Sequence, residues 1–187
     1  MKKFISVIMT LALILNCFGV LSVSAAESES TWDGTTIAST FSVGDGSQES
    51  PYLITNGAEL AYLSSLVNSG ESERGKYFKL VDSINLGSYS WTPIGNGDSH
   101  RFQGCFDGNN LRIDGLKIEN RENIEGDSSV YYGLFGNALG AVIENLTVQG
   151  EIISHSISQK NVFVGGIVGY NRVGTVQNCV SHVYVIY

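Results

Sequence analysis

The sequence has little charge, few cysteines and only 2 prolines among its 187 residues. Charged residues make up 16%, against about 25% in a typical soluble domain. The 18 acidic residues outnumber the 11 basic ones and no stretch is locally basic, which argues against nucleic-acid binding. Hydrophobic residues reach 43% and aromatic residues 10%, so a wholly disordered chain is excluded. We expect one modest domain with its own core.

Residues 1–25 predict a secretory signal peptide. Lys2 and Lys3 precede a mostly apolar run over residues 4–23, and small residues near position 25 offer a cleavage site. Polar residues 27–30 follow at once, which favours cleavage over the alternative, a retained membrane anchor. No later apolar stretch is long enough to span a bilayer. We therefore expect a secreted or cell-surface protein with no membrane span after signal removal.

Three cysteines are too few for a disulfide framework. Cys17 lies within the predicted signal peptide, and Asn16 before it does not fit a lipoprotein site. Cys105 and Cys179 remain, and two small buried thiols are the simpler interpretation. A disulfide between them in an oxidising compartment stays open as the alternative.

An extended segment over residues 26–50 precedes the one convincing helix. This segment is rich in Ser, Thr, Gly and acidic residues, and residues 51–54 then form a short apolar strand. Asn56 and Glu59 have N-cap and N3 spacing, similar to a capping box. A single apolar stripe follows, which predicts a short helix that packs on the core. The stripe consists of Leu60, Leu63, Leu66 and Val67.

From residue 76 onward the periodicity indicates β-strands. Residues 77–81 place Phe78 and Leu80 on one face of a strand. Residues 111–113 and 116–118 alternate in the same way, and Gly, Asn or Asp interrupts each segment after three to six residues. Strands this short are not stable alone, so we expect them to stack on neighbours.

Two motifs recur at one separation, which indicates an internal repeat. Residues 133–136 recur at 166–169, and residues 143–146 recur at 176–179, each 33 positions later. This spacing is typical of a solenoid, in which each unit buries its apolar face against the next. Glycines in such a unit permit turns and close backbone approach, and asparagines precede changes of direction. The structural motif residues are Gly133, Leu134, Phe135, Gly136, Gly166, Gly169, Asn145 and Asn178.

Gly133-Leu134-Phe135-Gly136 resembles the signature of GLUG-motif proteins, and the order of several upstream motifs strengthens the resemblance over roughly residues 44–182. The resemblance implies a right-handed parallel β-helix. It also implies a module of adhesin-like bacterial surface proteins, found beside the protease part of immunoglobulin A peptidases as well. Ser83 stands where similar sequences often carry Asp, and Cys105 where a small hydroxyl residue is common. The upstream motifs are residues 51–54, 59–60, 75–80, 91–95 and 102–109.

These observations predict a mainly β protein whose residues 51–187 form an N-terminal cap with one helix and the first rungs of a GLUG-type β-helix. We expect the chain to be truncated at its C-terminus, because similar proteins carry more motif copies. Residues 183–187 alternate as a strongly β-forming strand with no polar cap after them. An open apolar edge invites pairing with another chain, so end-to-end self-association is a further expectation.

The ionisable residues do not predict a catalytic or metal site. His100, His155 and His182 lack the spacing of zinc ligands. Asp107 and Asp114 are a candidate catalytic carboxylate pair, because enzymes with a parallel β-helix fold often cleave polysaccharides. Each of the two precedes a glycine, which is more typical of a tight turn.

The loops offer further candidates that we also expect to be structural. Asp33, Asp45 and residues 96–98 supply oxygen ligands, but none fits an EF-hand calcium loop. Residues 165–169 are Gly-rich without the Lys-Ser/Thr of a phosphate loop, and no nucleophile elbow is present. The aromatic candidates for sugar or protein contact, for which burial is an equal alternative, are Trp32, Trp91, Tyr131 and Tyr132.

The sequence thus predicts a secreted or cell-surface, non-catalytic interaction module of the adhesin-like kind. Its expected partner is an unknown extracellular protein or glycan, with no cofactor and no nucleic acid. Two alternatives stay open: an accessory fragment of a secreted hydrolase or lyase, linked to peptide or polysaccharide cleavage, and a non-functional truncated remnant. Turnover of a polysaccharide or an immunoglobulin by the purified protein would favour the hydrolase or lyase.

Overall fold

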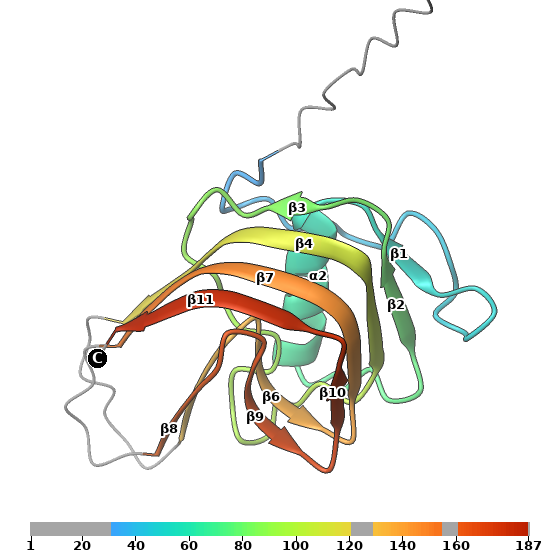
Figure 1. The fold of residues 1–187 in the computed structure, drawn as a ribbon. Coiled ribbons are helices and arrows are strands. Elements are labelled where there is room, and N and C mark those ends of the chain that lie inside the picture. The colour runs from blue at the N-terminus through green and yellow to red at the C-terminus, as the bar shows by residue number, and fades with distance from the viewer. Residues whose placement is uncertain (1–30, 121–128, 155–160, 187) are drawn as a thin grey trace, which may run out of the picture.

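The protein is mainly β-structure with one helix, as the sequence predicts. The computed structural model describes residues 31–120, 129–154 and 161–186 (Figure 1). The predicted signal peptide, His155 and Tyr187 lie outside the described residues. The elements in chain order are β1 (Tyr52–Ile54), α2 (Gly57–Asn68), β2 (Tyr77–Leu80), β3 (Ile84–Asn85), β4 (Cys105–Asn120), β5 (Val130–Tyr132), β6 (Phe135–Leu139), β7 (Val142–Ser154), β8 (Val162–Val164), β9 (Val168–Arg172), β10 (Thr175–Gln177) and β11 (Val180–Ile186).

Every pairing between these strands is parallel. The largest sheet runs β1-β2-β4-β7-β10, with β3 on β4 and β11 on β7. Two further sheets are the pairs β5-β8 and β6-β9. Parallel neighbours need long crossover connections, so the stack cannot arise from hairpins. The strands therefore stack as the sequence predicts, rather than pairing as antiparallel hairpins.

The last two layers of strands pair in a register that matches the 33-residue repeat of the sequence. Phe135 pairs with Val168 in one sheet, and Ile143 pairs with Val176 in another. We call the segment 130–154 the penultimate rung and the segment 162–186 the last rung. Both pass through the three sheets in the same order (Figure 1). Repeated sequence thus lies directly above its own earlier copy.

The prediction of strands of three to six residues is wrong for the two longest strands of the largest sheet, although β10 in the same sheet has three residues. β4 has 16 residues and β7 has 13. Gly, Asn and Asp do not end these strands; they bend them, and the β4–β7 register shifts between Asp107 and Leu111 and between Ile113 and Leu116. Asn109 and Asn110 have φ values of 53° and 60°, a left-handed conformation that Asn tolerates better than most residues.

Helix α2 forms because its start is capped and one face is apolar. Asn56 is the N-cap, and its side chain accepts a hydrogen bond from the Glu59 N–H at 3.0 Å. The Glu59 carboxylate does not complete a capping box with Asn56. It accepts instead from the backbone N–H groups of Thr55, at 2.8 Å, and Ser42, at 3.0 Å. The cap thus also fixes the segment that precedes β1.

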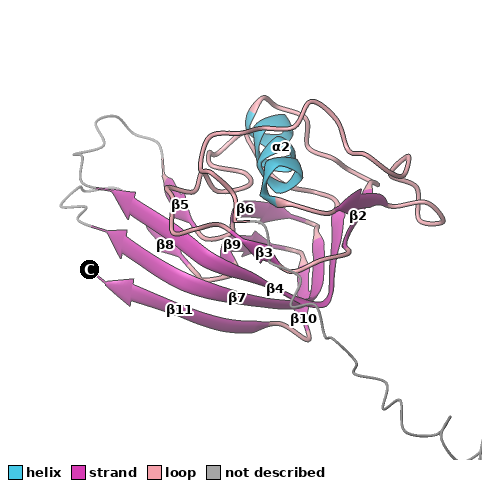
Figure 2. Ribbon diagram, turned by 90° about the horizontal axis from the view of Figure 1, so that it is seen from above, coloured by secondary structure: helices cyan, strands magenta, loops and turns pink. Residues whose placement is uncertain are grey.

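The apolar core runs through the interior of the stack and ends differently at its two ends. At the β1 end, α2 and residues 31–50 cover it, with Phe41 against Tyr52, Tyr62 and Phe78. At the other end, β11 and its neighbours form the outermost layer (Figure 2). The fully buried large side chains include Phe78, Phe102, Phe106, Phe135, Ile54, Leu60, Leu63, Leu80, Ile84, Leu86, Ile94 and Ile113.

Candidate functional site: polar rows on the large sheet

A row of amide and carboxylate side chains crosses the large sheet where its long strands bend. Asn145 donates from Nδ2 to Asp107 Oδ1 at 3.0 Å, and Asn178 donates from Nδ2 to Asn145 Oδ1 at 3.2 Å. We call these three residues the corner ladder. Asn145 and Asn178 have φ values of 55° and 52°, so both sit at left-handed bends. The sequence left open whether the two asparagines stack, and the structure shows that they do.

Asp107 begins the corner ladder as an ionised acceptor. Burial raises the pKa of its carboxyl group, but hydrogen bonds from Asn145 and the Asn109 backbone, together with Lys79, outweigh that effect and lower it. Lys79 Nζ lies 3.4 Å from Asp107 Oδ2. The carboxylate therefore holds three separate chain segments together, and its charge is stabilised where it lies.

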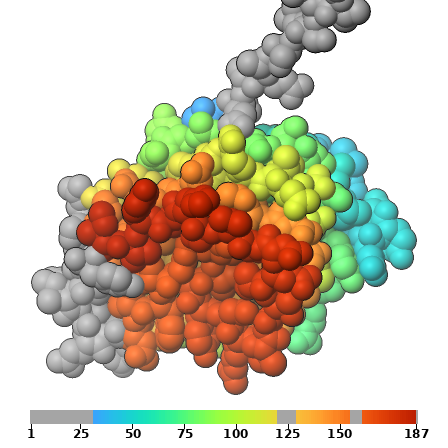
Figure 3. All heavy atoms as spheres, in the orientation of Figure 1, coloured from blue at the N-terminus to red at the C-terminus, as the bar shows by residue number. Residues whose placement is uncertain are grey.

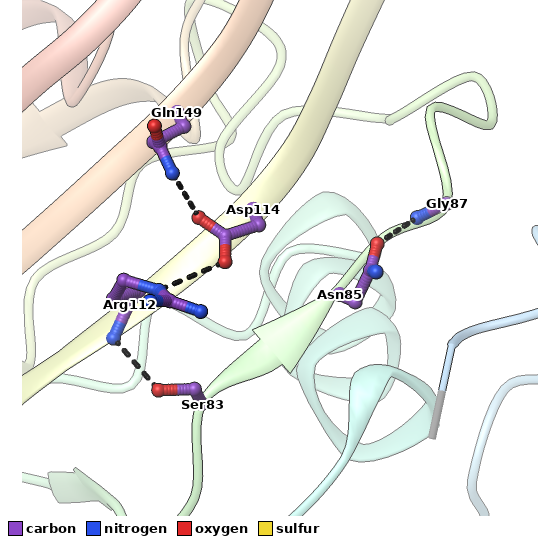
Figure 4. Close-up of polar contacts among 6 residues, drawn as sticks. All are labelled: Ser83, Asn85, Gly87, Arg112, Asp114 and Gln149. Atoms are coloured by element: carbon purple, nitrogen blue, oxygen red, sulfur yellow. Dashed lines mark hydrogen bonds and ion pairs between the residues drawn. The ribbon is translucent and has the colours of Figure 1, made fainter. Parts of the chain in front are cut away.

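A second polar row lies on the same sheet, further along β4 (Figure 4). Asp114 accepts from Gln149 Nε2 at 2.8 Å and from Arg112 Nε at 2.9 Å. The Arg112 backbone N–H donates to Ser83 Oγ at 3.3 Å. Ser83 thus accepts a hydrogen bond from a residue 29 positions later in the chain, at the start of this row. We call Ser83, Arg112, Asp114 and Gln149 the outer row.

Neither aspartate of the candidate carboxylate pair is positioned as a free acid or base. Asp107 accepts from the Asn109 backbone N–H at 2.8 Å, a tight-turn contact, and belongs to the corner ladder. Asp114 is held by Arg112 and Gln149. Asp107 therefore acts as a turn and inter-strand residue, and Asp114 as an inter-strand residue. Their arrangement can cross-link strands, and it offers no poised proton donor.

The histidines and loop acids do not gather into a metal site among the described residues. No group of three His, Cys, Asp or Glu side chains converges there. His100 is half-buried in a loop, and His182 is exposed on β11. Asp33 accepts hydrogen bonds from the Thr36 hydroxyl and from the backbone N–H groups of Thr36 and Thr35, which lower its pKa in that order.

The two other loop acids are engaged in the same local way. Asp45 accepts from the Ser47 backbone N–H at 2.8 Å. Asp98, the acid of the 96–98 loop, accepts from the Tyr131 hydroxyl. Burial and this contact with Asp98 raise the pKa of Tyr131. The loop acids thus hold their own turns and one neighbouring strand.

The aromatic candidates are core anchors. Trp32 and Trp91 pack edge to face with ring centroids 5.8 Å apart, and their indole N–H groups donate to the Thr36 and Leu134 carbonyls. Both are buried, as are Tyr131 and Tyr132. A groove of about 460 Å³ runs beside α2 and is lined in part by both tryptophans, which are only 9% and 3% exposed. Stacking on a sugar is therefore not supported at these four residues.

The motif glycines lie where neighbouring backbones touch. A Cβ atom on Gly133 or Gly136 would lie 2.5 Å from the carbonyl oxygen of Gly165 or Gly95 respectively. On Gly169 it would lie 2.6 Å from the Tyr132 carbonyl oxygen. None of these three has a positive φ, so the requirement is space rather than backbone conformation. Gly166 faces Ser181, and Leu134 and Phe135 are fully buried.

Cys105 and Cys179 are half-buried free thiols. Burial raises the pKa of both the Cys105 and the Cys179 thiol, and nearby Glu144 adds to the effect. A thiol with a raised pKa is a weak nucleophile, so neither is activated for catalysis. The structure does not join them as a disulfide.

Sequence reasoning missed the partners of Asp107 and Glu59. The contacts join positions 38 residues apart for Asn145–Asp107 and 17 residues apart for Ser42–Glu59. The Asn145–Asp107 contact could in principle be predicted, because Asp107 and Asn145 occupy the same bend of neighbouring strands. It becomes readable only once the β4–β7 register is known, and that register is irregular.

Comparison with known proteins gives two partial relatives. No family model matches the chain, and no solved structure gives a significant match. A protein of Evansella cellulosilytica named "Putative Gly-rich membrane protein" is 32% identical over 149 residues, which is 75% of this chain and 15% of the relative. Halomucin of Haloquadratum walsbyi is 30% identical over 166 residues, 76% of this chain and 2% of the relative. The chain thus spans only a small part of either.

No helix among the described residues is long and apolar enough to cross a membrane.

Proposed function

We propose that the chain is a GLUG-type module of a secreted or cell-surface protein, and that it acts by binding rather than by catalysis. The observation that carries the proposal is the use of its polar residues. The carboxylates of the corner ladder and the outer row bind neighbouring strands, and the loop acids bind their own turns. A scaffold of this kind presents a surface, and these carboxylates serve structural contacts rather than acid–base chemistry.

The parallel stack supports the finer part of the proposal, that the fold is a right-handed β-helix of the GLUG type. Parallel strands connected over three sheets are the elements of such a coil. The motif glycines supply the close approach between successive rungs that a Gly-x-x-Gly repeat provides. Right-handed connection is the general rule for parallel strands.

The surface location is supported by the predicted signal peptide and by the names of the two relatives, a Gly-rich membrane protein and halomucin. N-terminal sequencing of protein recovered from the medium or cell surface tests this part. We expect the mature chain to begin at residue 26 or 27. Recovery of the intact N-terminus with the cells would contradict secretion by cleavage.

The binding function is tested by offering the purified protein to arrays of extracellular glycans and proteins, with product analysis in parallel. We expect retention of a ligand without turnover. Alanine substitution of Asp107 and of Asp114 should change stability but reveal no lost activity. Cleavage of a polysaccharide or an immunoglobulin, lost in either variant, would overturn the proposal in favour of a hydrolase or lyase.

A further inference from the structure

The groove beside α2 is lined by uncharged residues throughout. Its walls are α2, a first loop of residues 32–37 and a second loop of residues 90–96. Its volume of about 460 Å³ lies within the range of small-molecule sites, about 300–1,000 Å³. Among the residues that the structure describes, no Asp, Glu, Lys, Arg or His lines it, although the chain carries 18 acidic and 11 basic residues. The later strands, which form most of the face seen in Figure 3, take no part in it.

Hydrogen bonds between α2 and the second loop fix the shape of this groove. Ser64 Oγ donates to the Thr92 carbonyl at 2.8 Å, and Asn68 Nδ2 donates to the Pro93 carbonyl at 3.0 Å. Asn68 Oδ1 accepts in turn from the Asn96 backbone N–H at 2.9 Å. A site whose walls are already held loses little conformational freedom when a ligand enters, which favours binding.

Four other polar side chains of the groove are available to a ligand. The side chains of Ser65, Ser90, Thr92 and Asn96 line it, are exposed, and make no hydrogen bond to any other described residue. Hydroxyl and amide groups can both donate and accept hydrogen bonds. Ile37, which also lines the groove, is 55% exposed and adds an apolar contact. The groove thus offers donors, acceptors and apolar surface side by side.

Two other grooves of similar volume differ from this one because they carry charge. One, of about 470 Å³, includes four charged side chains from the segment 71–76. The other, of about 410 Å³, includes Lys79, Asp107 and Glu144. A neutral ligand in either groove would displace water from charged groups without supplying an opposite charge, which costs free energy. The uncharged groove therefore suits a neutral ligand best, and it offers a charged ligand no counter-charge.

We propose that this groove binds a neutral saccharide. The inference rests on the binding function proposed above and names the class of ligand. Saccharide hydroxyls both donate and accept, as the Ser, Thr and Asn side chains of the groove do. An extended peptide is recognised along the edge of a strand, but the lining comes from α2 and loops and from none of the strands β1–β11. Because Trp32 and Trp91 are almost fully buried, hydrogen bonds hold the saccharide more than ring stacking does.

Tryptophan fluorescence tests the proposal at the groove itself. The chain has only 2 tryptophans and both line the groove, so their emission reports a ligand that enters there. The secreted chain is titrated with neutral oligosaccharides of glucose, galactose, mannose, xylose and N-acetylglucosamine. We expect a saturable change with at least one of them, at the Kd that calorimetry gives, and no change with an acidic oligogalacturonate. No saturable change with any neutral oligosaccharide, or a change with the acidic one alone, would overturn the proposal.

Substitutions in the groove locate the bound saccharide. Thr92→Val removes a hydroxyl at nearly constant shape and Asn96→Ala removes an amide, so each should weaken binding about fivefold to tenfold. Thr147→Val is the matched control, because Thr147 lies on β7 outside the groove, and it should leave the Kd unchanged. Circular dichroism verifies that all three variants are folded.

The outcomes separate this inference from the binding function on which it rests. Saccharide binding that calorimetry detects without a change in tryptophan emission, and that Thr92→Val and Asn96→Ala leave intact, would place the ligand elsewhere. That result would overturn the groove assignment and leave the binding function standing. Retention of a protein but of no neutral saccharide would overturn the ligand class alone. Failure to retain any glycan or protein would overturn both proposals.

Discussion

Asn178 donates a hydrogen bond to Asn145 at 3.2 Å, and the two residues hold the same left-handed bend 33 positions apart. The bond joins two copies of one repeat at the same point of successive rungs. It shows how a polar side chain can serve two purposes, because Asn tolerates the bend and its amide links the layers. The corner ladder is therefore the clearest point at which the sequence repeat becomes a structural repeat.

The middle of the corner ladder should contribute more stability than its end. Asn145→Ala removes a donor to Asp107 and an acceptor for Asn178, and it places Ala at a φ of 55°. We expect a loss of about 3 kcal/mol in the free energy of unfolding. Asn145→Gly should recover about 1 kcal/mol of it by relieving the backbone. Urea titrations measure both.

Asn178→Ala is the matched comparison for the ladder. Asn178 is exposed and bonds to one neighbour of the row, so its replacement should cost about 1 kcal/mol beyond any backbone strain shared with position 145. Equal losses at positions 145 and 178 would show that the bend, and not the ladder, is what stabilises the stack.

Close backbone approach should make Gly136 intolerant of any side chain. A Cβ atom there would lie 2.5 Å from the Gly95 carbonyl oxygen, so Gly136→Ala should lower the free energy of unfolding by about 2 kcal/mol or more. Gly97→Ala is the control, because its nearest neighbour is His100 Nδ1 at 3.2 Å. It should cost less than about 1 kcal/mol. Thermal unfolding of the two variants measures the difference. Similar melting temperatures would contradict the claim that Gly136 has no space for a side chain.

Glu59 should make stability depend on pH. The residue is 4% exposed; burial raises its pKa, but hydrogen bonds from Thr55 and Ser42 outweigh burial and lower it below the ordinary 4.5. Because the pKa is lower in the folded state, ionised Glu59 stabilises the protein at pH values above its ordinary pKa. This contribution is lost as the pH falls through the folded-state pKa.

Glu59→Gln tests that contribution directly. The variant should be less stable than the original chain by about 1–2 kcal/mol at pH 7, because its amide nitrogen faces backbone donors. The gap should narrow on acidification toward pH 3. A gap that stays constant between pH 7 and pH 3 would show that the carboxylate charge contributes nothing.

Ser83→Asp should strengthen the outer row. Ser83 Oγ accepts from the Arg112 backbone N–H at a long 3.3 Å, and a carboxylate is a stronger acceptor that also lies near the Arg112 side chain. We expect a gain of about 0.5 kcal/mol, small because Arg112 is exposed. Ser83→Ala should be slightly less stable than the original. Chemical denaturation in low and high salt separates them, and a loss with Asp would contradict the assigned role.

The repeat and the helix could be predicted because their signals are local or periodic. Two motifs at one separation fixed the register of the last two rungs, and the cap at Asn56 with its apolar stripe fixed α2. Stacked repeats make distant contacts readable, since each residue meets its own earlier copy. The same rule predicts that Asn145 and Asn178, which occupy equivalent positions of the repeat, lie next to each other.

The length of β4 and the partners of Glu59 could not be predicted, for a physical reason. In the sequence, Asp107 and Gly115 are typical of turns. Stacking against β7 instead keeps the chain extended at these positions, where β4 forms bulges. Ser42 meets Glu59 because the covering segment folds back over α2, which no local pattern encodes. In both places tertiary contacts override local preference.

Inter-strand nuclear Overhauser contacts in the isotope-labelled protein test the stacking most directly. The register predicts backbone contacts between Phe135 and Val168, and between Ile143 and Val176, in the pattern of parallel strands. Close Hα–Hα contacts between strands adjacent in sequence, as hairpins produce, would contradict the parallel stack and every proposal that rests on it.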